Sequence, residues 1–300
     1  MNDAANRVIN VMGGSGGGAT PLPPRTNRIN VMGGSGGGAT PLPPRSLVEI
    51  AQLGKTYPTP VGPSEVVRDF TLHVRQGEFV CIAGHSGCGK STVLSIIMGL
   101  NSPTTGGVVI GGREVSGPGT DRGVVFQSAT LLPWLTVRDN VRLSLGQVRP
   151  GAVAADADAY LDAVGLPGQG SRYPRELSAG MQQRVGIARA FALEPRLLLL
   201  DEPFSLLDAL TRMDLQDQLM TLWEAERKTV IMVTHDVDEA LFLADRIVMM
   251  TSGPAATVGE ILSVHFPRPR RREEILATSE YFELRDQVVG FLEERANVRA

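Results

Sequence analysis

GHSGCGKS, residues 84–91, matches the pattern G-x-x-x-x-G-K-[ST] at every fixed position. A dense apolar segment at 79–83 precedes it, and a helix-like run at 92–98 follows it. Glycines in such a loop let backbone N–H groups converge on phosphate oxygens, because no Cβ blocks the approach. A strand, a glycine loop and a helix in this order therefore predict a phosphate cradle for a nucleotide.

Two side chains at the end of this phosphate loop carry the expected chemistry. Lys90 is expected to reach the β- and γ-phosphates, and Ser91 to bind Mg²⁺. The helix N-terminus that follows adds partial positive charge. The loop residues expected to bind the nucleotide are Gly84, Ser86, Gly87, Cys88, Gly89, Lys90, Ser91 and Thr92. Cys88 has two interpretations: a thiolate-prone group at the mouth of the loop, alkylated unless nucleotide protects it, or a small residue that fills a tight turn.

The composition is that of a water-soluble folded chain. Its 300 residues are 42% hydrophobic and 20% charged, with a formal net charge of -3. No stretch approaches the roughly 18 consecutive apolar residues of a transmembrane helix. Two cysteines, Cys81 and Cys88, give no disulfide framework, which favours a reducing cytoplasm. The near-neutral charge argues against a nucleic-acid partner.

The first 45 residues contain an internal repeat. INVMGGSGGGATPLPPR occurs at 9–25 and again, unchanged, at 29–45. This Gly-, Pro- and Ser-rich composition offers too few apolar groups to offset the entropy of ordering, so 1–45 is expected to be a disordered tail. A recent duplication and a start codon placed too far upstream, with Met12 and Met32 as candidate starts, both explain the repeat, and the sequence does not separate them.

Secondary structure follows from the apolar pattern. Alternating apolar and polar residues predict antiparallel strands at 47–57 and 65–75, and glycine pairs predict turns at 106–107 and 111–112. Further strands are predicted at 79–83, 108–110, 124–127, 197–200, 230–233 and 246–250. Helices are predicted within 135–190, broken at Pro150, 165–170 and Pro174, and again at 279–295.

Strands that alternate with helices imply a parallel sheet. Leu197–Leu200 is a continuous apolar run, typical of a parallel strand buried on both faces. The basic run Arg268, Arg270, Arg271 and Arg272 is interpreted as a solvated surface.

Two carboxylates, Asp201 and Glu202, end the Leu197–Leu200 strand. In an open parallel sheet, ligands bind at the carboxyl ends of strands, where these carboxylates and the phosphate loop would meet. Asp201 is expected to hold Mg²⁺, directly or through water. Glu202 is expected to polarise the attacking water as a general base.

A further motif, LSAGMQQR at 177–184, opens a predicted helix with Ser178 as its N-cap. Together with the phosphate loop and the Leu-rich strand, it resembles the signature motif of ABC-transporter ATPases. The family pattern is usually LSGGQ, so Ala179 replaces a glycine and Met181 precedes Gln182. The resemblance, which extends from Ser46 to about Pro269, implies that Ser178, Gly180 and Gln182 bind ATP.

The other family landmarks follow in order along the chain. Gln127 matches the glutamine that senses the γ-phosphate and metal, and His235 matches the switch histidine that orients Glu202 and water. Asp208 matches the aspartate that aligns two subunits, although Ser205-Leu206 replaces the commoner Gly-Ala and puts that loop's backbone in doubt. Tyr57 matches the aromatic residue that stacks on adenine; packing of a turn before Pro58 is the alternative.

The resemblance implies an α/β fold: a P-loop NTPase with a RecA-like parallel core sheet, an antiparallel β subdomain and a helical signature subdomain. Three segments are expected: the tail at 1–45, the ATPase domain at 46–270 and a C-terminal helical extension at 271–300. The implied enzyme hydrolyses ATP to ADP and phosphate with Mg²⁺, and drives transport across a membrane.

The implied partners are a second ATPase subunit, identical or different, and separate transmembrane permease subunits; a periplasmic or lipid-anchored substrate-binding protein would act indirectly. ATP would lie between the phosphate loop of one subunit and Ser178 of the other, at the cytoplasmic face of the inner membrane. The permeases would dock near Gln127 and Leu131–Leu135, with Trp134 either in the core or at that interface.

Finer resemblance bears on the cargo. Residues 184–193, 234–240 and 249–256 resemble the nitrate/sulfonate/bicarbonate group of importers. The last of these stretches, followed by 259–262 and 266–270, is most similar to its nitrate branch. Uptake of nitrate or nitrite is therefore expected, with sulfonate, taurine, cyanate or bicarbonate as alternatives. A soluble ABC ATPase acting on DNA or ribosomes is disfavoured, because the chain has one cassette and no coiled coil. An inactive regulator is disfavoured because Lys90, Asp201, Glu202 and His235 are all present.

Overall fold

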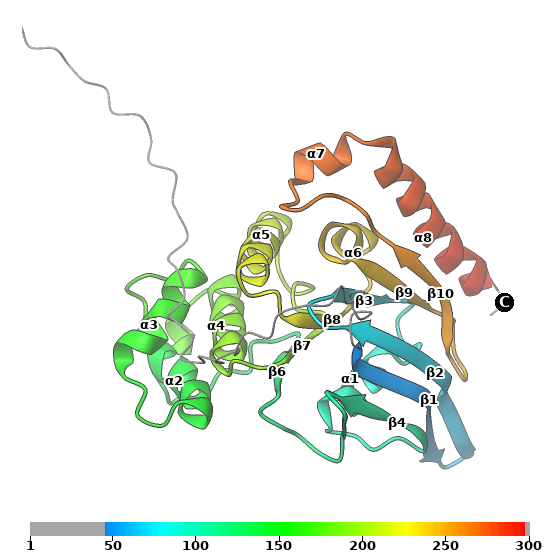
Figure 1. Ribbon diagram of the computed structural model, residues 1–300, viewed down its shortest axis with the longest axis horizontal. Helices are drawn as coiled ribbons and strands as arrows, with labels where there is room; N and C mark the ends of the chain where they lie inside the picture. The colour runs from blue at the N-terminus through cyan, green and yellow to red at the C-terminus, as the bar shows by residue number, and fades with distance from the viewer. Residues whose placement is uncertain (1–45, 298–300) are drawn as a thin grey trace, which may run out of the picture.

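The computed structural model describes residues 46–297 (Figure 1), so the tail expected at 1–45 lies outside the described residues. Two sheets organise these residues. The first is antiparallel, in the order β2-β1-β4-β5. Its strands are β1 (Ser46–Thr59), β2 (Gly62–Arg75), β4 (Thr105–Ile110) and β5 (Arg113–Glu114). The antiparallel strands predicted at 47–57 and 65–75 are thus confirmed as β1 and β2.

The second sheet has the order β10-β9-β3-β8-β7-β6. Its strands are β3 (Phe79–Ala83), β6 (Arg122–Val125), β7 (Leu197–Asp201), β8 (Thr229–Thr234), β9 (Arg246–Met250) and β10 (Val258–Ser263). All neighbours are parallel except β10, which pairs antiparallel with β9. The predicted parallel sheet is confirmed, and β10 is an edge strand that the sequence pattern did not predict.

Helices cover the parallel sheet on both faces. One face carries α1 (Lys90–Met98), which lies between the two sheets and shares their hydrophobic core. The remaining helices are α2 (Val137–Val148), α3 (Ala154–Ala163), the 3₁₀ turn η1 (Pro174–Glu176), α4 (Ala179–Ala192), α5 (Ala209–Glu226), α6 (Val237–Leu243), α7 (Arg272–Leu276) and α8 (Ser279–Asn297). Figure 1 shows α2, α3 and α4 grouped to one side as a helical subdomain.

The continuous apolar strands are explained by two cores, one on each face of the sheet. Along β7, Leu198 and Leu200 pack into the core beneath the helical subdomain, α5 and α6. Leu197 and Leu199 point to the opposite face and pack with α1. Because alternate residues of a strand face opposite sides, both sets must be apolar. This arrangement confirms the predicted α/β class with its antiparallel and helical subdomains.

Two local predictions of secondary structure were wrong, one of a turn and one of the bounds of a strand. Gly106-Gly107 is not a turn but part of β4, where Gly107 pairs with Ala51. Gly106 has a φ of 68°, and a Cβ there would lie 2.2 Å from the Ala51 carbonyl oxygen, so the glycine permits a close crossing of strands rather than a reversal. The strand predicted at 124–127 starts earlier and ends at Val125, which leaves Gln127 in the following loop.

The prediction of a solvated basic run was wrong for three of its four arginines. Arg270 is buried, and its guanidinium donates hydrogen bonds to carbonyl oxygens at the end of α6, those of Phe242 at 2.9 Å and Ala244 at 2.8 Å. Arg268 pairs with Asp245 and lies over the Trp223 ring, and Arg272 lies over the Phe242 ring. Helix carbonyls without intrahelical partners need donors, and these long side chains supply them. Only Arg271 remains exposed.

The C-terminal helix expected at 279–295 is confirmed as α8. It lies along α6 and β9, and Tyr281 and Val288 on its inner face are buried in the same core as α6. The division between an ATPase domain and an extension at residue 270 stays a prediction.

Candidate nucleotide site

The phosphate loop connects the end of β3 to the start of α1, as its sequence predicted. Gly87 and Gly89 have φ values of 76° and 104°, in the region that favours glycine. Gly89 precedes the first helical residue of α1, and a Cβ there would lie 3.0 Å from Val67 of β2. These two positions explain why the loop needs glycine for its shape as well as for its approach to a ligand.

Lys90 lies inside the curve of the phosphate loop. Its side chain is only 5% exposed, and its Nζ donates hydrogen bonds to the carbonyl oxygens of Gly84 at 2.7 Å and His85 at 2.9 Å. The two carbonyl oxygens hold the ammonium group at the loop, where it can form charge-assisted hydrogen bonds to a phosphate. A cavity of about 220 Å³ opens beside it, lined by Val66, Glu202 and loop residues; the loop residues are Ser86, Gly87, Gly89, Lys90, Ser91 and Thr92.

Ser91, which lines this cavity, contacts Asp201 behind it. The Ser91 hydroxyl donates to an Asp201 carboxylate oxygen at 3.3 Å. Burial raises the pKa of the Asp201 carboxyl, and the hydrogen bond from Ser91 acts against that rise. A hydroxyl and a carboxylate are hard oxygen ligands, and Mg²⁺ in nucleotide sites commonly takes one or two protein oxygens together with phosphate oxygens. The pair therefore fits Mg²⁺, although no group of three or more His, Cys, Asp or Glu within 46–297 could hold a metal alone.

Glu202 and His235 form the next pair, directly after the adjacent parallel strands β7 and β8. The His235 Nδ1 lies 3.1 Å from a Glu202 carboxylate oxygen, so a protonated Nδ1 donates to it. The Glu202 backbone has a φ of 44°, unusual for a non-glycine residue, and its N–H donates to the Val233 carbonyl. Strained backbone conformations of this kind cluster at functional sites. Glu202 is consistent with that pattern, since it lines the cavity beside the phosphate loop.

Gln127 reaches this pair through Ser205. The Gln127 amide donates to the Ser205 hydroxyl at 3.0 Å, and that hydroxyl donates to the Glu202 carbonyl oxygen at 3.0 Å. Sequence reasoning treated Ser205 only as a departure from a family pattern and missed this link. Among residues 46–297, the Gln127 side chain hydrogen-bonds to Ser205 and not to the Ser91–Asp201 pair, so its metal role stays a prediction.

The signature residues lie apart from the phosphate loop, in the helical subdomain. Ser178 is exposed and caps α4 by accepting the Met181 N–H at 3.3 Å. Gly180 lies against Thr211, where a Cβ would come within 2.4 Å of the threonine methyl. The Gln182 amide donates to the carbonyl oxygens of Pro174 and Leu177. None of Ser178, Gly180 and Gln182 lines the cavity at the phosphate loop.

Asp208 and Tyr57 do not line the cavity at the phosphate loop. Asp208 caps α5 by accepting the Thr211 N–H at 3.0 Å, and hydrogen bonds from Thr211 lower the pKa of its carboxyl. Thr211, in the first turn of α5, is also the residue that lies against Gly180, so the capped end of α5 supports the start of the signature helix. The Tyr57 hydroxyl accepts from Asn101, and the Lys55 ammonium lies 4.8 Å from the Tyr57 ring centroid. One face of a half-buried ring is thus occupied within this chain.

Cys88 does not lie at the mouth of the loop, contrary to the first interpretation of its sequence position. It is 1% exposed and packs in the core shared by α1 and both sheets. A Cβ at Gly84 would lie 2.8 Å from its sulfur, so a larger side chain at position 88 would displace the loop. This placement supports the second interpretation, a small residue that fills a tight turn.

Sequence reasoning missed a buried carboxyl beneath His235. Glu239 accepts hydrogen bonds from Thr234 and from the Gln216 amide, and Thr234 in turn accepts the Asp236 N–H. Burial raises the pKa of Glu239 to about 7. In the sequence, only its position four residues after His235 could have indicated that Glu239 lies near the site.

The Glu239→Gln variant is expected to gain stability relative to the wild type as pH rises. The Glu239 pKa is 4.5 in a model compound and about 7 in the folded chain, so folding favours the protonated form. Stability from that form is fully present below about pH 4.5 and is lost as pH rises through about 7. The gain should reach about 3 kcal/mol. Urea unfolding of both proteins at pH 5 and pH 8 measures this gain in the free energy of unfolding. The same change with pH in the variant and the wild type would contradict the prediction. Glu273→Gln, at an exposed carboxylate, is the control.

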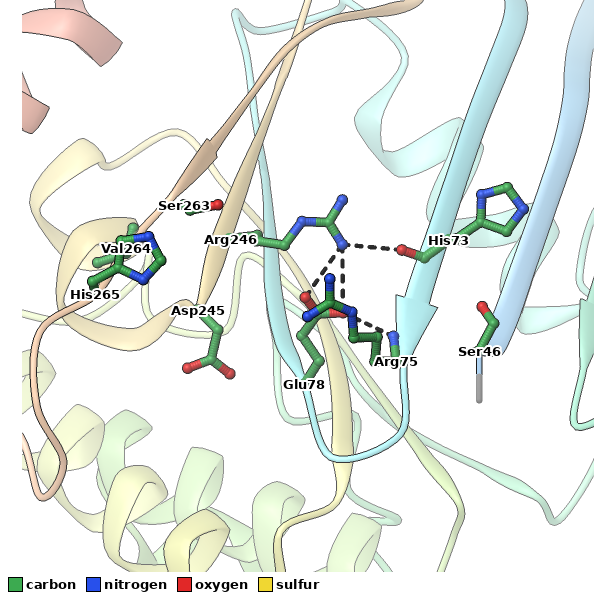
Figure 2. Close-up of a pocket in the computed structure, with 9 residues that line it drawn as sticks. All are labelled: Ser46, His73, Arg75, Glu78, Asp245, Arg246, Ser263, Val264 and His265. Atoms are coloured by element: carbon green, nitrogen blue, oxygen red, sulfur yellow. Dashed lines mark hydrogen bonds and ion pairs between the residues drawn. The ribbon is translucent and has the colours of Figure 1, made fainter. Parts of the chain in front are cut away.

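A larger cavity than the one at the phosphate loop lies elsewhere in the described chain (Figure 2). Its volume is about 670 Å³, and it lies where β3 and β9 begin, whereas the phosphate loop follows the end of β3. Arg246 crosses it to Glu78 at 3.2 Å and to the His73 carbonyl at 3.0 Å. Asp245 is paired with Arg268. No residue of the phosphate loop lines this cavity, so it is not part of the nucleotide site.

Comparisons with known proteins agree with this geometry. The family model described as ABC transporter matches residues 67–205. The nitrate import ATP-binding protein NrtD of Synechococcus elongatus is 50% identical over 247 residues, which cover 81% of this chain and 90% of that protein. The bicarbonate transport ATP-binding protein CmpD of a Synechocystis species is 47% identical over 254 residues, 83% of this chain and 90% of that protein.

A solved structure extends the likeness to three dimensions. The ATP-binding cassette MJ0796, described as a dimeric post-hydrolysis state bound to ADP and Pi, is 34% identical and superposes with a TM-score of 0.65. The alignment covers 73% of this chain and all of that one. In the described part of the present chain, no helix has the length and apolar character needed to cross a membrane.

Proposed function

Because this chain belongs to the ATP-binding subunits of ABC transporters, in the nitrate and bicarbonate importer group, we propose that it powers the uptake of nitrate or nitrite. The chain is an ATPase whose hydrolysis is coupled to transport. One observation carries the chemistry: Glu202 faces the phosphate loop while His235 Nδ1 lies 3.1 Å from its carboxylate.

Each residue has a role in hydrolysis. Lys90 holds the β- and γ-phosphates of ATP, and the backbone N–H groups of the phosphate loop bind the same oxygens. Glu202 accepts the proton of the attacking water, and His235 keeps the carboxylate aimed and contacts the γ-phosphate. Ser91 and Asp201 would hold Mg²⁺, which would neutralise phosphate charge. Tyr57 offers its remaining ring face to adenine.

The active site is proposed to form between two copies or two homologous chains. Ser178 is exposed at the N-terminus of α4 and lies outside the cavity at the phosphate loop of its own chain. The backbone N–H groups and the positive dipole end of a helix N-terminus suit a phosphate that is bound to a partner subunit. The relative cassette MJ0796 is described as dimeric. Asp208 would then support the signature helix at the same interface.

Permease subunits are proposed to bind near Gln127 and Leu131–Leu135. Trp134 is 70% exposed, so it does not belong to the core, and large aromatic side chains are enriched at protein interfaces. Two hydrogen bonds in series join the Gln127 side chain to Ser205 and Ser205 to the Glu202 backbone. A permease that displaced Gln127 would therefore change the position of Glu202. Such an assembly places this subunit at the cytoplasmic face of a membrane, with a substrate-binding protein on the other side.

Cargo-stimulated ATPase activity tests the choice of substrate. The two relatives differ by only three percentage points in identity, 50% for nitrate and 47% for bicarbonate, so bicarbonate is the second candidate. The complex with its membrane partners and its binding protein would be assayed with nitrate, nitrite, cyanate, bicarbonate and an alkanesulfonate. Stimulation by nitrate or nitrite is expected. Stimulation by bicarbonate alone would contradict the nitrate assignment and keep the ATPase assignment.

A further inference from the structure

The C-terminal helix α8 contacts the phosphate loop itself. The His85 Nε2 lies 2.7 Å from the Leu292 carbonyl oxygen, a residue more than two hundred positions later in the chain. A carbonyl oxygen only accepts hydrogen bonds, so Nε2 carries the proton and donates. His85 is partly buried and is the second residue of the loop, directly after Gly84. Family matching had given this histidine no role.

The backbone of the same residue contacts the key lysine. Lys90 Nζ donates to the His85 carbonyl oxygen at 2.9 Å and to the Gly84 carbonyl oxygen at 2.7 Å. His85 is therefore held on two sides, by α8 through its ring and by Lys90 through its backbone. A shift of its ring toward or away from α8 would move an oxygen that fixes the Lys90 ammonium.

The helix that holds His85 is itself firmly fixed. Val288 is fully buried, and Asp238 of α6 accepts hydrogen bonds from Tyr281 at 2.7 Å and from Arg285 at 2.8 Å. Near β10 the packing is tight, since a Cβ at Gly259 would lie 2.3 Å from the Phe291 ring. An anchor of this kind is rigid enough to set the position of a loop.

We infer that His85 is a positioning residue, which ties the phosphate loop to α8 and so sets the position of Lys90 for binding ATP. The inference rests on the nucleotide site of the proposed function and not on the cargo. It also gives the C-terminal helix a part in nucleotide binding, since α8 supplies the fixed acceptor. Because Lys90 contacts phosphate before and during hydrolysis, loss of the tie should weaken binding more than it slows the chemical step.

Two variants of His85 and one control on α8 test this inference in the full chain. His85→Leu keeps the bulk but loses the donor, and it should raise the ATP Kd and KM about fivefold, the factor that one net hydrogen bond supplies. The kcat should change less than twofold, by the same reasoning. His85→Gln places an amide N–H near the former Nε2 and should restore the wild-type Kd. Gln287→Ala is the matched control on α8: its amide pairs with Glu260, so ATP affinity should not change.

Thermal unfolding without nucleotide separates positioning from stability, because a lowered Tm with unchanged Kd would indicate a structural role and overturn the inference. Equal losses in the Leu and Gln variants would also overturn it. If the Leu variant does not fold, His85→Asn replaces it, since its shorter amide does not reach Leu292 and should again weaken ATP binding. Failure of the wild-type protein to bind ATP would instead refute the proposed function.

Discussion

Lys90→Ala is expected to lose measurable ATP binding. In the wild type Lys90 is 5% exposed, and two carbonyl oxygens hold its ammonium group beside the cavity at the phosphate loop. Charge-assisted hydrogen bonds are worth about 1.5–3 kcal/mol each, so losing two to phosphate should raise the Kd on the order of a hundredfold or more. Alanine also leaves the carbonyl oxygens of Gly84 and His85 without their donor, which loosens the loop.

Equilibrium titration with a fluorescent ATP analogue measures this effect. Arg271→Ala is a suitable control, since it removes a cation that is exposed and far along the chain from the site. A Kd for Lys90→Ala within about threefold of the wild-type value, less than one charge-assisted bond is worth, would mean that the lysine does not contact the phosphates.

Glu202→Gln is expected to bind ATP normally and to hydrolyse it about 10²–10⁴ times more slowly, the usual contribution of a general base. The amide has the same shape as the carboxylate but does not accept the proton of water. With hydrolysis blocked, the ATP-bound dimer should persist. Phosphate release in a single turnover and the elution volume on size exclusion with ATP measure the two effects.

The control for this variant is Glu273→Gln, which neutralises an exposed carboxylate on α7. If Glu202→Gln released phosphate at the wild-type rate, the base would lie elsewhere in the site. If, in addition, no ATP-bound dimer of the variant persisted on size exclusion, the assignment of Glu202 as the general base would again be contradicted.

The sequence predicted the parts of the site that depend on local order. A strand, a glycine loop and a helix are contiguous in the chain, and continuous apolar runs identified β7 and β8 as buried parallel strands. Since parallel strands end at one edge of a sheet, Glu202 and His235 had to meet near Lys90. Their 3.1 Å separation agrees with that expectation.

Features that depend on contacts between distant segments were not predictable. In the sequence Arg270 belongs to a basic run that predicts a solvated surface. In the fold its guanidinium is buried and donates hydrogen bonds to carbonyl oxygens at the end of α6. Ser205 looked like a substitution in a motif and instead joins Gln127 to Glu202. The His85 contact with Leu292 spans most of the described chain. In each case a polar group found its partner through tertiary packing, which residue spacing does not encode.

Hydrolysis by a mixture of two inactive variants tests most directly whether the site forms between two chains. Lys90→Ala removes the lysine proposed to bind phosphate, and Ser178→Arg is designed to block the N-terminus of the signature helix, so each variant alone should be inactive. A mixed dimer contains one complete site, built from the loop of one chain and Ser178 of the other. With random pairing, the mixture should recover roughly a quarter of the wild-type sites in single-turnover hydrolysis. A mixture no more active than the two variants measured separately would contradict a shared site.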